Sequence, residues 1–228
     1  MAKSIDEFNN LEWMGDSKKA LGITGAALLP YLVAAYRQGD AISNALGPNS
    51  DVKGGVCVAL SMHWIRQHQS NRNTPRLGEN GLFNSQQVIN EARAVQLAYT
   101  QAKKAAGENE AVAQTAGFIE AAKRYRMALI GDVAKHTFSE ATLLTQIKRV
   151  HSYHVVALAG LGVGHATATY MSSGKILGFG RHLYLFDPNI GELKIPESEV
   201  AYAIAALTTR YQLLDKKYKF LFRGEIKP

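Results

Sequence analysis

Hydrophobic residues recur at helical spacing through the first two thirds of the chain. Between residues 56 and 69, for example, Val56, Leu60 and Trp64 are four residues apart, which places them on one side of a helix. A longer helix is predicted next, with Ser85 or Asn84 as its N-cap and Gly107 at its end. The predicted helices span residues 20–38, 56–69, 85–106 and 108–130, with a shorter one from residue 139. Segments rich in Gly, Pro and Asn predict loops at residues 44–55 and 70–80.

After residue 150 the pattern changes to short strands. Between residues 165 and 171, His165, Thr167 and Thr169 alternate with the apolar Ala166 and Ala168, which is typical of a strand. The predicted strands span residues 155–159, 165–171, 183–186, 193–195 and 218–222, with a helix at residues 198–214. Helices come first and strands joined by short turns come second, so the order favours an α+β fold with an antiparallel sheet.

The composition is that of a globular protein, because 46% of the 228 residues are hydrophobic and 20% are charged; this excludes a disordered or fibrous chain. The single cysteine excludes an intrachain disulfide and a Cys-based zinc cluster, and no HExxH motif indicates another metal site. The formal charge of +7 is spread along the chain and favours acidic partners in general, which are a nucleic acid, an anionic membrane surface or an acidic protein. A stacking platform for nucleic acid needs exposed aromatic residues interleaved with basic ones, whereas the aromatic residues of the strand region are interpreted as sheet core, so no nucleic-acid partner is expected. These residues are Phe179, Tyr184, Phe186, Tyr218, Phe220 and Phe222.

The N-terminal segment does not have the pattern of a secretory signal. Residues 1–16 contain four acidic side chains, whereas a signal peptide opens with a short basic region. The most apolar stretch, residues 21–35, is shorter than the ~20 residues that span a bilayer, so it is predicted to be a buried helix. We therefore expect a soluble protein that is exported without a cleavable signal peptide.

The most informative segment surrounds the only cysteine. Cys57 follows Gly54 and Gly55 and lies in the predicted first turn of a helix. Glycines allow a sharp turn and the close approach of a substrate, and the partial positive charge at a helix start favours the thiolate form of a cysteine. A free cysteine is more often buried and inert, so a nucleophile also needs a base nearby.

That base needs a further group to orient it. Of the seven histidines, His165 is the best candidate, because it begins a strand after a glycine-rich turn and has the small Ala166 beside it. Asp187 ends the predicted strand at residues 183–186, and an antiparallel neighbour to the His165 strand would bring the two side chains together. Cys57, His165 and Asp187 are therefore the candidate nucleophile, base and orienting carboxylate.

Three segments in this order resemble the YopT-type cysteine proteases, a family of papain-like bacterial effectors. They read Gly-Val-Cys-Val-Ala-Leu-Ser-Met-His-Trp around Cys57, Gly-His-Ala-Thr-Ala around His165, and Leu-Phe-Asp-Pro-Asn-Ile-Gly-Glu-Leu around Asp187. The resemblance covers residues 54–193 and implies a papain-like α+β fold. It implies that Cys57 is the nucleophile, His165 the general base and then acid, and Asp187 the group that orients His165. It also implies a secreted effector or toxin that cleaves a protein of a host or competitor cell.

On this interpretation residues 51–228 form the catalytic domain, and residues 1–50 form a helical N-terminal segment. That segment is a candidate translocation or partner-binding region, with a chaperone or an immunity protein as candidate partner. Papain-like enzymes complete their oxyanion hole with an amide side chain a few residues before the cysteine. Here Asp51 stands six residues before Cys57, and an ionised carboxylate cannot donate a hydrogen bond, whereas Asn49 is a nearby amide.

The reaction type is easier to infer than the substrate. Acyl transfer through a thioester needs no cofactor, and its steps would serve a peptide bond, a glutamine side chain or a peptidoglycan amide. The sequence therefore leaves three functions open: a cysteine protease, a glutamine deamidase or peptidoglycan amidase toxin with the same triad, and a binding module without turnover.

Overall fold

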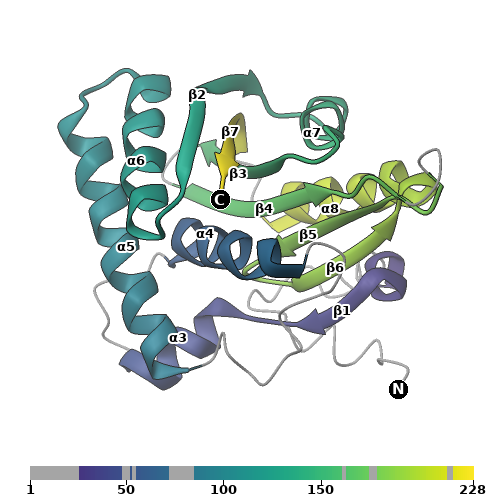
Figure 1. Cartoon of the computed structure of the whole chain (residues 1–228), viewed down its shortest axis with the longest axis horizontal. Coiled ribbons are helices and arrows are strands. Elements are labelled where there is room, and N and C mark those ends of the chain that lie inside the picture. The colour runs from purple at the N-terminus through teal and green to yellow at the C-terminus, as the bar shows by residue number, and fades with distance from the viewer. Residues whose placement is uncertain are drawn as a thin grey trace.

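The chain folds around a seven-stranded antiparallel sheet. The computed structural model describes residues 26–47, 52, 55–71, 85–160, 163–174, 179–214 and 218–228. The strand order is β1-β6-β5-β4-β3-β7-β2 (Figure 1). The strands are β1 (Leu32–Ala35), β2 (Ala128–Thr137), β3 (Tyr153–Gly160), β4 (Val163–Met171), β5 (His182–Asp187), β6 (Gly191–Pro196) and β7 (Tyr218–Lys227). Every neighbouring pair in this sheet is antiparallel, which confirms the predicted α+β class.

Helices cover both faces of the sheet. Figure 1 shows α4 in front of the central strands, α5 and α6 side by side next to it, and α8 behind the sheet. The helices are α3 (Gln38–Leu46), α4 (Cys57–His68), α5 (Gln86–Ala105), α6 (Glu110–Arg124), α7 (Glu140–Ile147) and α8 (Val200–Leu214). Short 3-10 helices occupy η2 (Leu29–Tyr31), η3 (Gln69–Asn71) and η6 (Glu197–Glu199).

Alternation along the strands divides the hydrophobic core between the two faces. On β3, Val155 and Ala157 belong to the cluster that packs under α4, α5 and α6. Their neighbours Val156 and Leu158 belong to a second cluster that packs against α7 and α8. Strand β3 is therefore buried on both sides, between two packed layers of helices.

The turn from β5 to β6 requires a glycine. Gly191 pairs with Asp187 and has a φ of 128°, in the region that side chains rarely adopt. An added Cβ would also collide with the backbone oxygen of Ala34 on β1. The turn therefore lies close against the first strand, and this contact fixes the position of Asp187 at the end of β5.

Several predicted elements are confirmed with small changes at their ends. Ser85 caps α5 by accepting a hydrogen bond from Val88 N, and the helix ends just before Gly107. Ser139 caps α7 by accepting from Thr142 N. The five predicted strands correspond to β3, β4, β5, β6 and β7.

Three other predictions are wrong. Residues 32–35, predicted as helix, form the edge strand β1, because Leu32 and Ala34 pair with β6. The helix predicted to reach residue 130 ends at Arg124, and β2 begins at Ala128 as the other edge strand. The loop predicted from residue 44 begins later, since α3 continues to Leu46. The loop predicted at residues 70–80 lies mostly outside the described residues. The division at residue 50 stays a prediction.

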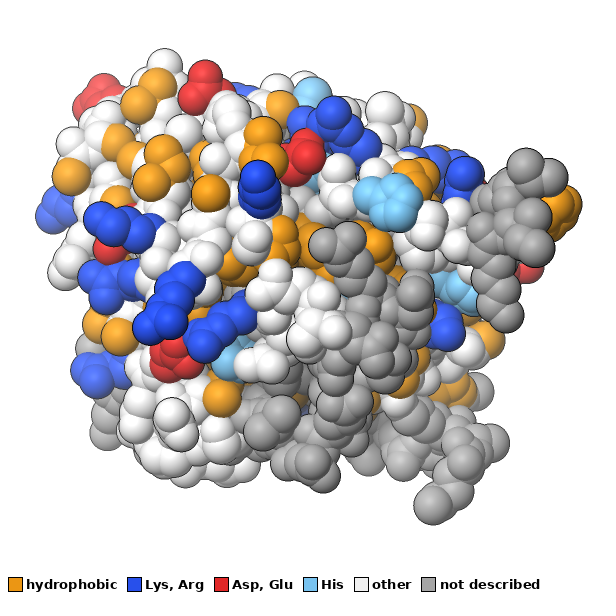
Figure 2. All heavy atoms as spheres, in the orientation of Figure 1, with side chains coloured by type: hydrophobic (Ala, Val, Ile, Leu, Met, Phe, Trp, Pro, Cys, Tyr) orange, Lys and Arg blue, Asp and Glu red, His pale blue; other side chains and the backbone are white. Residues whose placement is uncertain are grey.

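The surface charge is not gathered into a single patch on the face shown in Figure 2, where Lys and Arg side chains are spread among uncharged and acidic ones. No helix in the described ranges is long and apolar enough to cross a membrane. The same ranges contain no group of three or more His, Cys, Asp or Glu side chains placed to hold a metal ion.

Candidate active site

Cys57 is the first residue of α4 and is almost buried, with 8% of its surface exposed. The chain reaches it through Gly55, whose φ of 98° favours glycine. An added Cβ at Gly55 would lie 2.9 Å from the side-chain oxygen of Gln38. Because the first N–H groups of a helix have no partner within it, this position offers a partial positive charge to a thiolate.

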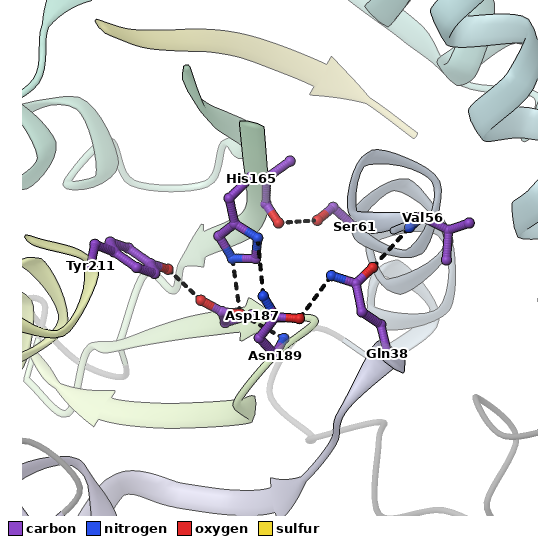
Figure 3. A network of polar contacts seen from close by, with 8 residues as sticks. Gln38, Val56, Ser61, His165, Asp187, Asn189 and Tyr211 are labelled. Carbon is purple, nitrogen blue, oxygen red and sulfur yellow. Dashed lines mark hydrogen bonds and ion pairs between the residues drawn. The ribbon is translucent and has the colours of Figure 1, made fainter. Parts of the chain in front are cut away.

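His165 and Asp187 form the polar pair at the ends of β4 and β5. His165 Nε2 lies 3.0 Å from Asp187 Oδ1, and both side chains are buried (Figure 3). The same carboxylate oxygen accepts a second hydrogen bond, at 2.7 Å, from the backbone N–H of Asn189. Tyr211, on α8, donates its hydroxyl proton to the other oxygen, Oδ2. Three donors therefore hold the Asp187 carboxylate in one orientation.

The pKa values of the pair shift in the directions expected of an ion pair. Burial alone would lower the pKa of His165, but the charge and hydrogen bond of Asp187, with a smaller contribution from the Cys57 thiol, raise it to about 10. Burial alone would raise the pKa of Asp187, but the charge of His165 and the hydrogen bonds from His165, Tyr211 and Asn189 lower it. Both shifts favour the charged forms, a cationic His165 and an anionic Asp187.

The Cys57 thiol and His165 line the same cavity, and the nearby thiol helps to raise the pKa of the imidazole. Since Nε2 is directed at Asp187, the other ring nitrogen, Nδ1, is the one left for the thiol. The structure thus brings together all three residues that the sequence indicated, from α4, β4 and β5.

Two side-chain amides link the helix start to the histidine. Gln38 Oε1 accepts a hydrogen bond from the backbone N–H of Val56, at 2.8 Å, and Gln38 Nε2 donates to Asn189 Oδ1, also at 2.8 Å. Asn189 Nδ2 in turn lies 3.5 Å from His165 Nδ1 (Figure 3). Because the amide nitrogen is a donor, this contact is a hydrogen bond only while Nδ1 carries no proton. Ser61 adds a further tie, since its hydroxyl donates to the backbone oxygen of Ala166 at 3.3 Å. These contacts fix α4 relative to β4 and to the turn after β5.

Sequence reasoning missed Gln38 and Tyr211. Neither residue lies in a recognisable motif, and each reaches the site from a distant part of the chain, through α3 and α8. The sequence carried no local signal for them. The oxyanion-hole candidates Asp51 and Asn49 lie outside the described residues.

A cavity of about 420 Å³ opens beside Cys57 and His165. One wall comes from α5, with Gln96, Tyr99 and Lys103, and the opposite wall from the ends of β3 and β4. The thiol and the imidazole therefore face a space that a peptide segment could enter.

A thiol at a helix start, with helices packed on an antiparallel sheet, is the architecture of the papain-like cysteine peptidases. The family model for peptidase C58, described as Yersinia/Haemophilus virulence surface antigen, matches residues 31–219. The chain therefore belongs to this family of cysteine peptidases, which is of the bacterial virulence effector type.

The fold also agrees with that of a solved structure, the crystal structure of the Pseudomonas avirulence protein AvrPphB. The two share 19% sequence identity and superpose with a TM-score of 0.64, over 88% of this chain and 100% of that chain. At this identity the match establishes the fold, which confirms the papain-like architecture. A search of curated proteins gives no significant match.

Proposed function

We propose that this protein cleaves a peptide bond in a protein of a target cell, with Cys57, His165 and Asp187 as its catalytic triad. The observation that carries the proposal is the Asp187–His165 hydrogen bond of 3.0 Å beside a thiol at the start of α4. In such an arrangement the imidazolium stabilises the thiolate, and the carboxylate stabilises the imidazolium.

The reaction proceeds in two acyl-transfer steps. The Cys57 thiolate attacks the carbonyl carbon of the substrate, and the carbonyl oxygen becomes an oxyanion. As the C–N bond breaks, the His165 imidazolium gives its proton to the leaving amine. His165 then takes a proton from a water molecule, whose oxygen attacks the thioester, and the Cys57 thiolate is released.

The oxyanion needs hydrogen-bond donors at the helix start. The N–H of Val56 is bonded to Gln38, and the N–H of Ala59 donates to Gln96 Oε1 at 3.3 Å. No residue of the described ranges accepts from the N–H of Cys57 between them. We assign this N–H as one donor of the oxyanion hole. Gln38 holds the segment just before it, so the donor is fixed before the substrate binds.

The experiment is to incubate the purified protein with a denatured proteome-derived peptide library and to identify new N-termini by mass spectrometry. The wild type should generate them, and the variants Cys57→Ala and His165→Ala should not. Release of ammonia without new N-termini would favour the glutamine deamidase, and cleavage of peptidoglycan alone would favour the amidase. If none of these substrates is altered by the wild type, the protein is a binding module and the proposal is wrong.

A further inference from the structure

The cavity beside Cys57 adjoins a second cavity of about 460 Å³. Both are lined by Lys103, Gln114 and Ala159, so Lys103 lies at their junction. A substrate chain whose carbonyl reaches Cys57 would therefore place a neighbouring side chain close to the Lys103 ammonium.

Lys103 gives the first cavity a net positive charge, because the opposite charges of a Cys57 thiolate and a His165 imidazolium offset each other. Among the described residues that line it, the ionisable groups are Cys57, His165, Tyr99 and Lys103, and none is a carboxylate. The second cavity also contains Lys104, Glu108 and Glu110 in its walls. The carboxylate of Glu110 forms an ion pair with Lys135, whose Nζ lies 2.7 Å from Glu110 Oε2. The electrostatic potential in the first cavity, beside Cys57, is therefore positive because of the Lys103 ammonium.

The Lys103 side chain is held in place rather than free in solvent. Its Nζ lies 5.3 Å from the centre of the Tyr99 ring. Its stem passes over Gly117 of α6, where an added Cβ would come within 2.7 Å of both Lys103 Cγ and the Tyr99 ring. The Tyr99 hydroxyl is fixed in turn by Gln114, whose Nε2 donates to it at 2.8 Å. An ammonium positioned in advance loses little conformational entropy when it binds an anion.

Partial burial of the Lys103 ammonium favours its binding to a carboxylate. Burial lowers the pKa of Lys103, and the charges of Glu110 and Cys57 offset that shift only in part. An ammonium that has lost part of its hydration regains stabilisation from a charge-assisted hydrogen bond.

We infer that Lys103 forms a subsite for an Asp or Glu side chain of the protein substrate, within reach of the bond that Cys57 attacks. This inference rests on the proposed protease function. It adds to that function a preference for an acidic residue beside the cleaved bond, carried by Lys103 at the junction of the two cavities.

The test is a comparison of cleavage-site preferences in a randomised peptide library. The wild type should select Asp or Glu at one position near the cleaved bond, and replacing that residue by Asn or Gln should lower kcat/KM by about 10- to 100-fold. Lys103→Ala should remove the selection, Lys103→Arg should retain it, and Lys103→Glu should favour Lys or Arg at the same position. Lys104→Ala is the matched control, because Lys104 is exposed and lines only the second cavity; it should keep the wild-type preference.

A second readout separates this role from a direct effect of the Lys103 charge on the thiolate. The charges of Lys103 and Cys57 interact, so Lys103→Ala should move the pH profile of Cys57 alkylation to higher pH, but by much less than His165→Ala does, and the acidic preference should be lost. A slower alkylation with an unchanged acidic preference would overturn the subsite. If the wild type cleaves peptides without any acidic preference, the subsite is wrong and the protease function stands. If it cleaves no peptide at all, the protease function fails, and the subsite fails with it.

Discussion

His154 and His165 lie on the neighbouring strands β3 and β4 and are both buried, but their surroundings shift their pKa values in opposite directions. Neither ring nitrogen of His154 has a hydrogen-bond partner in the described part of the chain. Burial, followed by the charges of Arg223 and Arg149, lowers its pKa to about 3. For His165 the effect of burial is outweighed by the Asp187 carboxylate, which raises the pKa to about 10.

The difference shows what turns a buried histidine into a candidate catalyst. Burial disfavours the charged imidazole in both places, so burial by itself leaves the side chain neutral. A carboxylate at 3.0 Å, held by Tyr211 and Asn189, makes the cationic form the stable one beside the Cys57 thiol. The opposite pKa shifts of His154 and His165 are therefore explained by Asp187 and by the hydrogen-bond donors that hold its carboxylate.

The largest effect is expected from Asp187→Asn, which should make the region around His165 resemble that around His154. An amide has no charge to stabilise the imidazolium, so kcat/KM for peptide cleavage should fall by about 10³–10⁴-fold. The check is steady-state kinetics, with circular dichroism to establish that the variant is folded. A loss of less than about tenfold would mean that Asp187 does not determine the state of His165.

Tyr211→Phe should have an intermediate effect, because it removes one donor to the Asp187 carboxylate and leaves the carboxylate in place. We expect kcat to fall by about 10- to 100-fold with little change in KM. The hydroxyl lowers the pKa of Asp187, so its loss should move the acid limb of the kcat profile to higher pH. Tyr202→Phe, an exposed position on the same helix, is the control. An unchanged pH profile with a reduced kcat would indicate a purely structural role.

His154 should make the folded protein sensitive to acid. Its folded pKa is about 3 and the ordinary value is 6.5, so below about pH 6.5 the unfolded chain binds a proton that the folded chain rejects. As the pH falls from about 7.5 to about 5.5, this difference in proton binding should lower the free energy of unfolding by about 1 kcal/mol. His154→Leu should remove this part of the pH dependence. His63, with a pKa lowered by burial to about 4, contributes a similar share that remains in the variant.

Urea unfolding of both proteins at the two pH values measures the effect. An equal acid sensitivity in the wild type and in His154→Leu would contradict the neutral state of His154. The expected contribution of His165 has the opposite sign. Its folded pKa is raised, so its stabilisation is complete below about pH 6.5 and is lost as the pH rises toward about 10.

The smallest effect is expected from Arg149→Ala. Arg149 Nη1 lies 2.6 Å from Glu225 Oε2, but its side chain is 63% exposed. Solvent screens such a charge, so the free energy of unfolding should change by less than about 0.5 kcal/mol at neutral pH. The same urea titration checks this. A change of the free energy of unfolding above about 1 kcal/mol would mean that the charge of Arg149, rather than burial, is the main cause of the lowered pKa of His154.

The sequence predicted the parts of the fold that depend on local signals. The starts of α5 near Ser85 and of α7 near Ser139, and the end of α5 before Gly107, were predicted, because helix ends are decided by the residues located there. The strand β1 was missed because Leu-Val-Ala-Ala has no strand periodicity of its own and becomes a strand by pairing with β6. The edge strand β2 was missed for a similar reason, since most of its residues are exposed and do not alternate.

The candidate site divides in the same way. Cys57, His165 and Asp187 each lie beside a local signal, a glycine turn or a strand end, and the antiparallel order of strands was enough to bring two of them together. Tyr211 and Gln38 act through contacts that only the tertiary structure creates, since each lies on a helix packed against a turn far away in the sequence. A single sequence carries no pattern for such contacts.

The central claim is that Cys57 and His165 form a thiolate–imidazolium pair, and the most direct test is the rate of alkylation of Cys57 by iodoacetamide as a function of pH. The chain has one thiol, so the readout is unambiguous. We expect the wild type to react rapidly down to about pH 6, whereas His165→Ala should react rapidly only near the free-thiol pKa of about 8.5. If both proteins show the same profile, centred near about pH 8.5, the pair does not exist in the free protein and the triad is wrong.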